Sequence, residues 1–489
     1  MSSKRPLISL RMAGISLIDC DHKTPKAQEQ GRPYVGIPQL KDGRITLNGA
    51  RLISEEDFHH WRRKTKPTPD DVVLSRRCNP GESSYVPNAL EFALGQNLVL
   101  LRSDGTKIYP PFLRWLTQGT QWWSQVNMYI NVGAVFDSLK CADIPKFEIY
   151  LPELNEQKRI AETLGGLDGK IQINHKINQT LEQMAQAIFK SWFVDFEPVK
   201  AKIAALEAGG SEEDALLAAM QAIAGDTQEC TNTVEGSAPG AATGGKLTRL
   251  QAEQPEQYAT LCATAELFPS AMQDSELGEI PEGWEVGALA DLADLNKKSW
   301  TKRTIPSEIE YVDLANTKNG IIESTTVYAS DDAPSRARRK FSDGDTIIGT
   351  VRPGNRSFAF IQQASEILTG STGFAALSPK HKAYSEFVYI AATSNESINH
   401  LAHLADGGAY PAVRPEVVSR IITVIPSNRV LERFHELTCP YFEHSASLKA
   451  ESSLLARTKD TLLPRLLSGE LCVSKAESEL TRSEEVADV

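Results

Sequence analysis

The pattern of apolar and polar residues along this chain separates strand-rich segments from helical ones. Short β-type apolar runs, bounded by turn residues such as Asp42-Gly43, predict β-strands. The strands are expected at 71–75, 97–102, 147–151, 309–314, 346–350, 357–361, 373–377 and 420–425. Short helices are expected at 111–118 and 386–393. The predicted fold class is therefore α+β.

Two longer segments follow a heptad pattern instead. Residues 153–197 contain no proline, and their seam consists of Ile160, Leu164, Leu167, Ile171, Asn174, Asn178, Leu181, Ala185, Ile188 and Trp192. The second seam, within 427–471, consists of Phe434, Tyr441, Leu448, Leu455 and Leu462. Because each seam is too narrow to be buried against its own domain alone, we expect two long helices that pair as an antiparallel coiled coil.

Three residues are expected to modify these helices. Asn174 and Asn178 lie in the first seam, where an amide lowers stability but fixes the register of the pair. Pro440 is expected to break or bend the start of the second helix, because proline has no N–H to donate.

Much of the first part of the chain returns in the second half. Tyr34–Ile45 is matched by Tyr311–Ile322, Asp71–Leu74 by Asp345–Ile348, and Leu151–Pro152 by Ile425–Pro426. A duplicated unit that ends each time in a long helix presents two similar faces. This architecture suits a protein that binds two targets at once. The sequence thus predicts a mixed α/β domain at 1–152, a helix at 153–199, an acidic Ala/Gly-rich linker with short helices at 200–275, a second mixed domain at 276–426, a helix at 427–471 and an acidic tail at 472–489.

The net charge of −11 is concentrated in two segments. Residues 203–245 carry acidic side chains and no Lys or Arg, and residues 476–489 are also acidic overall. The rest of the chain is neutral in sum and contains sharp basic clusters, so the total charge does not exclude a nucleic-acid partner. Seven widely spaced cysteines and the lack of a long apolar run favour a cytoplasmic protein without a membrane span.

Motifs that would indicate an enzyme are incomplete. Gly240–Lys246 is similar to a phosphate-binding P-loop, but Leu247 stands where a hydroxyl would hold Mg²⁺. A nuclease motif could combine Pro69-Asp70 with Glu156-x-Lys158 or Asp168-x-Lys170, yet we interpret these charges as solvated helix residues. The nine histidines lack the usual ligand spacing. We therefore expect no catalytic residue and no metal site.

Basic and polar residues on predicted loops, at matching places in the two repeats, are the positive signal. Lys and Arg neutralise phosphates, while Arg and Asn can read guanine and adenine edges. A solvated surface loop is the alternative for any single cluster. The candidate DNA-binding residues are Lys41, Arg62, Arg63, Lys64, Arg76, Arg77 and Asn79 in the first repeat and Lys318, Arg336, Arg338, Arg339, Lys340, Thr350, Arg352, Asn355 and Arg356 in the second. Trp122 and Trp123 could stack on bases, but a place in the core is the more common role.

Four stretches of the chain resemble the specificity (S) subunit of type I restriction–modification systems. Leu151–Ala161 and Gln183–Phe196 are similar to its central conserved region, and Leu462–Leu471 is similar to its distal conserved region. Leu277–Trp284 resembles the start of its second target-recognition domain. The resemblance covers essentially the whole chain.

This resemblance implies two target-recognition domains, spaced by the paired conserved helices, that each read one half of a split, asymmetric double-stranded DNA site. It implies no catalytic site and no directly bound cofactor in the chain itself. The implied partners are two methyltransferase (M) subunits, which bind S-adenosylmethionine, and restriction (R) subunits, which use ATP and Mg²⁺. The implied partner-docking residues are Gln183, Phe189, Trp192, Phe193, Phe196, Leu463, Arg465 and Leu467.

Two other functions remain open from the residues alone. The chain could be a nuclease that acts by itself through the acidic residues and lysines named above. It could also be a bipartite DNA-binding regulator without an enzyme partner.

Overall fold

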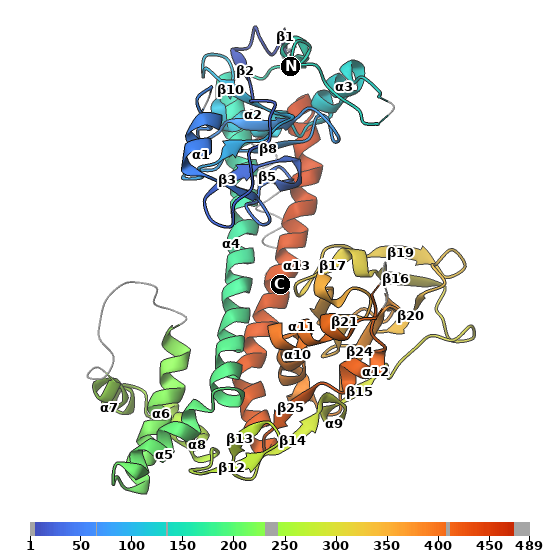
Figure 1. The fold of residues 1–489 in the computed structure, drawn as a ribbon. Coiled ribbons are helices and arrows are strands. Elements are labelled where there is room, and N and C mark those ends of the chain that lie inside the picture. Colours follow the sequence, from blue (N-terminus) through green and yellow to red (C-terminus); the bar gives the residue numbers. More distant parts are fainter. Residues whose placement is uncertain (1–4, 65, 134, 230–242, 407–410, 474–489) are drawn as a thin grey trace. The chain divides into compact units, whose positions relative to one another are not determined.

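The computed structural model describes residues 5–64, 66–133, 135–229, 243–406 and 411–473, and the chain forms two compact units (Figure 1). Unit 1 is built from residues 1–173 and 451–489, and unit 2 from residues 174–450. Two long helices, α4 (Leu154–Phe193) and α13 (Asn428–Ser468), contribute a part to each unit. Among the described residues, no helix has both the length and the hydropathy that crossing a membrane demands.

A four-stranded antiparallel sheet forms the centre of unit 1. Its order is β2-β10-β7-β8, with bounds Ile15–Asp19, Leu98–Ser103, Val72–Ser75 and Ser83–Tyr85. Successive side chains of β7 are buried in different cores, as the two-residue period of a strand requires. Val72 and Leu74 pack with helix α2 (Pro110–Leu116), whereas Val73 packs with a smaller sheet.

That smaller sheet has the order β6-β3-β9, in which β3 pairs antiparallel with β6 and parallel with β9. The remaining elements of unit 1 are the hairpin of β4 and β5, the pair of β1 and β11, and two further helices. Their bounds are β6 Arg51–Ile53, β3 Arg32–Val35, β9 Ala93–Leu94, β4 Leu40–Lys41, β5 Arg44–Ile45, β1 Leu7–Ser9, β11 Glu148–Tyr150, α1 Glu55–Trp61 and α3 Thr120–Tyr129.

Unit 2 repeats this organisation, which confirms the predicted internal duplication. Its central sheet has the order β15-β24-β21-β22, with bounds Ala293–Leu295, Phe374–Pro379, Thr346–Gly349 and Phe358–Phe360. In the second sheet, β16 (Glu308–Val312) pairs antiparallel with β19 (Thr326–Ala329) and parallel with β23 (Leu368–Ser371). These are the pairings that β3 makes in unit 1.

The other elements of unit 2 include the two short strand pairs that complete the repeat and the predicted short helix at 386–393, which is α10. Their bounds are β17 Thr317–Lys318, β18 Ile321–Ile322, β14 Glu285–Ala288, β25 Ile422–Ile425, β20 Ala337–Lys340, α9 Leu289–Leu292, α10 Ser385–Thr393, α11 Asn395–Leu404 and α12 Pro415–Ser419.

The hairpins β4–β5 and β17–β18 have nearly the same backbone φ angles at their turns. Asp42 and Asn319 have φ of 48° and 47°, and the glycines that follow them also have positive φ. Two consecutive positive φ angles define the tight hairpin turn for which Asp-Gly and Asn-Gly are preferred. The same turn chemistry therefore fixes the position of Lys41 and Lys318 in the two units.

Within each unit, α4 and α13 run antiparallel. In unit 1, Lys170 lies 3.2 Å from Glu451 and Asp168 lies 3.5 Å from Lys459. Residue numbers therefore rise along α4 in the direction in which they fall along α13. In unit 2, Phe189 and Trp192 pack against Phe434 with ring centroids 6.1 Å apart. The predicted helical pairing is confirmed within both units.

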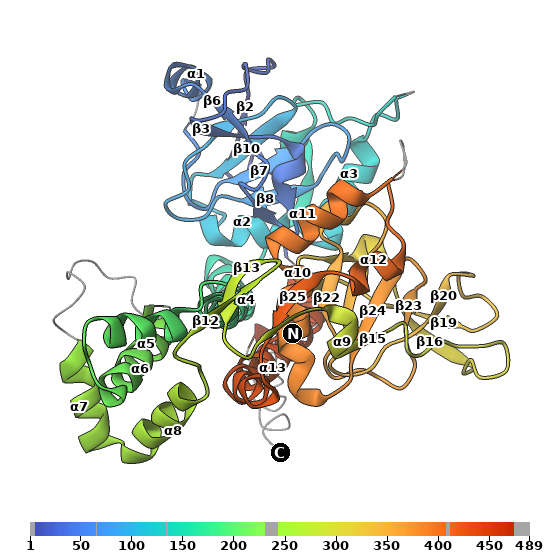
Figure 2. The same cartoon turned by 60° about the horizontal axis from the view of Figure 1, so that its bottom comes forward.

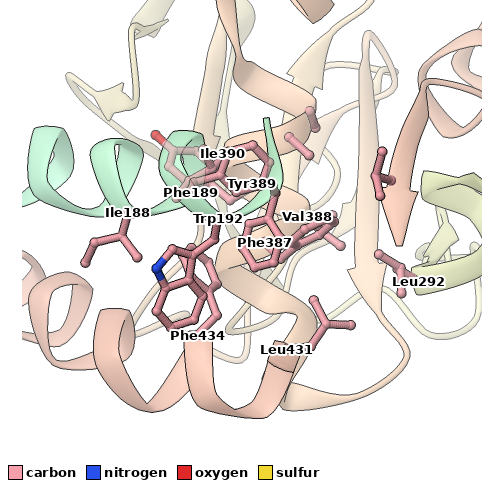
Figure 3. Packing of buried hydrophobic residues seen from close by; sticks show 14 of the residues in the cluster. Ile188, Phe189, Trp192, Leu292, Phe387, Val388, Tyr389, Ile390, Leu431 and Phe434 are labelled. Carbon is pink, nitrogen blue, oxygen red and sulfur yellow. The ribbon is translucent and has the colours of Figure 1, made fainter. Parts of the chain in front are cut away.

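Figure 3 shows the aromatic junction at the unit 2 end of this pair. Phe189 and Trp192 of α4, Phe387 of α10 and Phe434 of α13 point into one core. The ring centroids of Phe189 and Phe387 lie 5.2 Å apart in a tilted arrangement, close to the edge-to-face geometry that aromatic pairs favour. This core joins the α4–α13 pair to the strands and helices of unit 2.

Two expectations about the helices need correction. Pro440 does not break α13, which is continuous across it, since burial of Phe434 and Phe442 on either side offsets the one missing hydrogen bond. The first helix ends at Phe193 rather than at 199, because Phe196 has a left-handed φ of 55° and a separate helix, α5, begins at Glu197 with Pro198 in its first turn. Of the two seam amides, Asn174 is buried, and the buried Oδ1 of Asn178 has no hydrogen-bond partner.

The segment at 200–275, which we expected to be a linker with short helices, contains helices that lie together as a group (Figure 2) and share buried residues with the core of unit 2. They are α5 Glu197–Glu207, α6 Glu212–Glu229, α7 Thr243–Glu253 and α8 Pro255–Glu266, followed by the hairpin of β12 Met272–Ser275 and β13 Gly278–Pro281. Met220, Leu247 and Phe268 contribute buried side chains. Part of the P-loop-like stretch Gly240–Lys246 lies outside the described residues.

Candidate nucleic-acid interface

Two loops at equivalent places in the repeat carry many of the candidate DNA-binding residues. The β7–β8 loop begins at Arg76, whose N–H donates to the carbonyl of Asn97 at 2.9 Å. The β21–β22 loop begins at Thr350, whose N–H donates to the carbonyl of Gly373 at 2.8 Å. Both residues also accept a backbone hydrogen bond, from Leu139 and Val413 respectively. The two loops thus leave their sheets with the same backbone hydrogen bonds.

Both loops contain a non-glycine residue in the left-handed region, two residues after the start. Cys78 has φ of 67° and Arg352 has φ of 48°, and Arg356 farther along the second loop has φ of 59°. Such conformations cost energy for residues with a side chain and concentrate at binding and active sites. The repeat of the strained position in the two units points to a shared use of these loops.

A polar hollow of about 360 Å³ opens beside the β7–β8 loop. It is lined by His22, Arg76, Arg77, Gln96 and Asn97. Arg76 Nη2 lies 3.4 Å from His22 Nδ1, and His22 Nε2 lies 3.0 Å from a carboxylate oxygen of Asp19. Guanidinium and amide groups that converge on one hollow can contact base edges in pairs.

His22, Gln96 and Asn97 were not among the residues predicted from the sequence. Gln96 and Asn97 lie just before β10, whereas Asn97 was predicted to be the first residue of that strand, and both residues also line a second hollow of about 440 Å³ near Gln39 and Arg51. Asn97 has a positive φ of 68°. The dipeptide Gln96-Asn97 was the available sequence signal for a binding site, but the same polar dipeptide is common in turns that bind nothing.

The structure divides the unit 1 candidates into exposed and buried residues. The exposed side chains are Lys41, Arg63, Lys64, Arg77 and Asn79. Arg63 and Lys64 lie 3.7 and 2.8 Å from Asp21, and Asn79 donates to Glu82 at 3.1 Å. Arg62 and Arg76 are each only 9% exposed, so their side chains belong mainly to the fold. Arg62 lies over the ring of Phe58 at 4.6 Å and faces Glu91 at 3.4 Å.

The unit 2 candidates divide in the same way. The exposed ones are Lys318, Arg336, Arg352 and Asn355, and the partly buried ones are Arg338, Arg339, Lys340 and Arg356. Arg356 donates to Asn319 at 3.0 Å and to Asn395 at 2.9 Å, which fixes its guanidinium beside the β17–β18 hairpin. Lys340 lies 4.6 Å from the ring centre of Trp300. Thr350 is buried, and its hydroxyl donates to the carbonyl of Gly373 at 2.8 Å.

One predicted equivalence is wrong. Arg62–Lys66 and Arg336–Lys340 occupy the same place in chain order, but they are not matching loops. The first follows helix α1, whereas most of the second forms strand β20. Burial lowers the pKa of Arg339, because its guanidinium lies at the edge of that sheet rather than in open solvent.

Most of the expected docking residues lie in the two cores and not on a helix surface. Phe189, Trp192, Phe193 and Phe196 are at most 7% exposed in unit 2, and Leu463 and Leu467 are buried in unit 1. Trp192 and Phe434 illustrate the reason, since the apolar seam faces the partner helix (Figure 3). Gln183 is exposed and Arg465 is partly exposed. Trp122 is also a core residue, and its ring N–H donates to the carbonyl of Gly81 at 2.9 Å.

The helix carboxylates of the possible nuclease motif, Glu156 and Asp168, are engaged in ion pairs. Asp168 was expected to be solvated but is 4% exposed and lies against Arg44, Arg114 and Lys459. Glu156 binds Arg5 at 2.7 Å. A carboxylate that faces three cationic groups has little capacity left for Mg²⁺. The geometry therefore disfavours a nuclease centre at Asp168.

Comparisons with known proteins show what this chain is similar to. A family model described as "Type I restriction modification DNA specificity domain" matches residues 19–183. The type I restriction enzyme HindI specificity subunit of Haemophilus influenzae is 29% identical over 457 residues, 87% of this chain and 94% of that protein. The MjaIX specificity subunit of Methanocaldococcus jannaschii is 22% identical over 87% of this chain and 83% of that protein.

Among solved structures, the S subunit of a type I restriction–modification system from M. genitalium matches with a TM-score of 0.47 at 13% identity. That match covers 94% of this chain and 95% of that one.

Proposed function

Because the chain belongs to the specificity subunits of type I restriction–modification systems, we propose that it reads a bipartite, asymmetric double-stranded DNA site. Residues 1–152 and 276–426 would serve as the two target-recognition domains, each reading one half-site. A specificity subunit is the non-catalytic member of such a system, so the chemistry is carried out by partners. Partner subunits would supply S-adenosylmethionine, ATP and Mg²⁺.

The observation that carries this proposal is the repeat of the β7–β8 loop as the β21–β22 loop. Both loops leave a sheet of the same strand order, both hold a left-handed residue, and both present exposed basic side chains. Arg77 in the first loop and Arg352 in the second would contact base edges or phosphates. Different side chains on the same backbone frame would let the two units read different sequences.

The contacts of the α4–α13 pair support a spacer role. Each unit holds its own portion of both helices through buried contacts, Leu164 and Leu466 in unit 1 and Trp192 and Phe434 in unit 2. A helical pair anchored in this way at 153–199 and 427–471 would set the gap between the half-sites. Phosphate contacts would position each domain, and a few polar side chains would discriminate the bases.

The proposed partners are two methyltransferase subunits and the restriction subunits. Their docking surface would include the exposed side chain of Gln183 and the partly exposed side chain of Arg465. The buried aromatic residues of α4 would act indirectly, by fixing the helix that presents Gln183. The reduced state of the described cysteines suits a cytoplasmic complex.

The test is a map of methylated adenines in a host that expresses the methyltransferase with and without this chain. The expected result is a new methylated motif, made of two short specific sequences separated by a fixed gap of unspecified bases. A new motif without a gap would contradict the bipartite reading. No new motif would contradict the assignment to a methyltransferase complex, and DNA cleavage by the pure chain with Mg²⁺ would favour a nuclease.

A further inference from the structure

A group of metal-ligand side chains in unit 2 lies outside the candidate DNA interface. Glu386 of α10 and His435 and Cys439 of α13 each offer one ligand atom, and these atoms all lie within 4.8 Å of one another. The side chain of Glu386 is 4% exposed and that of His435 is 17% exposed. His435 Nδ1 lies 2.6 Å from a carboxylate oxygen of Glu386. The ligand atoms therefore converge in a largely buried place.

A further carboxylate lies beside this group on α13. Cys439 Sγ lies 3.3 Å from Glu443 Oε1, and Glu443 is exposed. The three converging residues offer one imidazole nitrogen, one sulfur and one carboxylate, with two ligands from α13 and one from α10.

We propose that Glu386, His435 and Cys439, with Glu443 beside the sulfur, form a binding site for Zn²⁺ or a cation of similar chemistry. A tetrahedral set of nitrogen, sulfur and carboxylate oxygen suits zinc, whereas Mg²⁺ and Ca²⁺ prefer oxygen ligands alone. The ion would join α10 to α13 inside unit 2. It would thereby fix the second recognition domain on its portion of the paired helices.

An open hollow gives the ion a path to this place. The hollow measures about 600 Å³, and its lining includes the three proposed ligands with Glu443 and Asp343, and also Lys297, Lys298 and Lys382. A solvent-connected approach is one of the requirements for a metal site that fills after folding.

A second group of the same residue types does not qualify. Asp19, Cys20 and His22 of unit 1 also place their ligand atoms within 4.8 Å of one another. The guanidinium of Arg76, however, lies 3.4 Å from His22 Nδ1 and would repel a cation. His22 of this group also lines the polar hollow of the candidate DNA interface.

The test is zinc binding by the purified full-length chain. After incubation with Zn²⁺ alone and removal of free metal, the wild-type chain should retain about one zinc per chain by elemental analysis. Cys439→Ser and His435→Gln should reduce the retained zinc to the background level. With Co²⁺ as the probe, the wild-type chain should show the ultraviolet absorption of a sulfur–cobalt bond, which Cys439→Ser should abolish.

Cys262→Ser is the matched control. Cys262 Sγ lies 3.9 Å from Glu266 Oε1, so it has the same Cys–Glu spacing on a helix as Cys439 and Glu443. Its group lacks the histidine and the second carboxylate from another helix, and the variant should retain zinc like the wild type. Should Cys439→Ser fold poorly, Glu443→Gln should still weaken zinc binding by about 10-fold.

A wild-type chain that retains no zinc, or equal retention in the wild type, Cys439→Ser and His435→Gln, would overturn the proposal. Both results would leave the DNA-reading function untouched, because the site shares no residue with the candidate interface.

Discussion

The guanidinium group of Arg114 lies against the carboxylate of Asp168, a residue of α4 whose side chain is 6% exposed. Arg44 lies 2.5 Å and Lys459 lies 3.5 Å from the same carboxylate. Burial alone would raise the pKa of Asp168, but the positive charges of Arg114 and Arg44 outweigh it and hold that pKa below its ordinary value. One carboxylate therefore ties α2, β5 and α13 to α4 within unit 1.

Asp168→Ala should destabilise unit 1 by about 3–5 kcal/mol, because it leaves three cationic groups without their shared buried partner. Urea unfolding of the full-length chain, followed by far-ultraviolet circular dichroism, measures the change. Asp460→Ala is the control, since Asp460 is an exposed residue of α13 and its loss should change stability by less than about 0.5 kcal/mol. Equal effects of the two substitutions would contradict the anchoring role of Asp168.

The contribution of Asp168 should depend on pH in the acid range. Its pKa is lower in the folded chain than in the unfolded chain, so folding favours the ionised form. That stability is complete above the unfolded-state pKa of about 3.9 and is lost as the pH falls through the folded-state value. Between about pH 5 and pH 7, the difference in unfolding free energy between the wild type and Asp168→Asn should be constant. Below about pH 4 that difference should shrink. An undiminished difference at lower pH would rule out the titration of Asp168 as its source.

Arg77→Ala and Arg352→Ala should each weaken binding to the complete DNA site by about 1–3 kcal/mol if the side chain reads a base. Each arginine is exposed on its own loop, so each substitution should affect one half-site only. Fluorescence anisotropy at one fixed salt concentration measures the affinities for the complete site and for duplexes with one half-site scrambled. Scrambling the half-site read by unit 2 should remove the effect of Arg352→Ala but not that of Arg77→Ala.

Arg457→Ala is the control for these two substitutions, because Arg457 is exposed on α13 and lies outside both loops. The same loss of affinity with Arg457→Ala would mean that overall charge, and not loop position, explains the effect. Arg76→Ala is expected to act differently from Arg77→Ala. Arg76 is 9% exposed, and its substitution should lower the stability of unit 1 as well as the affinity for DNA.

The strands and helices could be predicted because their signals are local. The apolar run at Val72–Ser75 and the heptads from Ile160 to Trp192 each specify an element from neighbouring residues. The side-chain groups could not be predicted in this way. Asp168 meets Arg44, Arg114 and Lys459, and Glu386 meets His435, only after the chain has folded.

The division between core and surface also depends on the folded structure. The resemblance of 183–196 to a conserved region marks Trp192 and Gln183 alike, yet one side chain is 1% exposed and the other is exposed. Which of them faces a neighbouring helix depends on where α13 and α10 lie. The same limit applies to Arg62, which resembles a free basic residue in sequence but lies over Phe58 in the structure.

Trp192→Ala and Gln183→Ala should therefore impair the complex by different routes. Trp192→Ala removes a buried aromatic side chain and should destabilise unit 2 by about 3–5 kcal/mol. Gln183→Ala should leave the unfolding free energy within about 0.5 kcal/mol of the wild type but weaken binding of the methyltransferase subunit. Urea unfolding and a titration with purified methyltransferase subunit separate the two effects. Unchanged methyltransferase binding by Gln183→Ala would exclude that residue from the docking surface.

Removal of one heptad from each long helix should shorten the preferred gap in the DNA site. A heptad of α-helix is about 10 Å long, roughly the rise of three base pairs, and its removal keeps the apolar seam on nearly the same side. The deletions must be matched, for example 173–179 in α4 and 446–452 in α13, because the helices run antiparallel and a single deletion would shift their register. Methylation mapping of the double-deletion variant should recover the wild-type half-sites at a reduced spacing. If the half-sites and the gap were both unchanged, the helical pair would not set the distance between the two recognition domains.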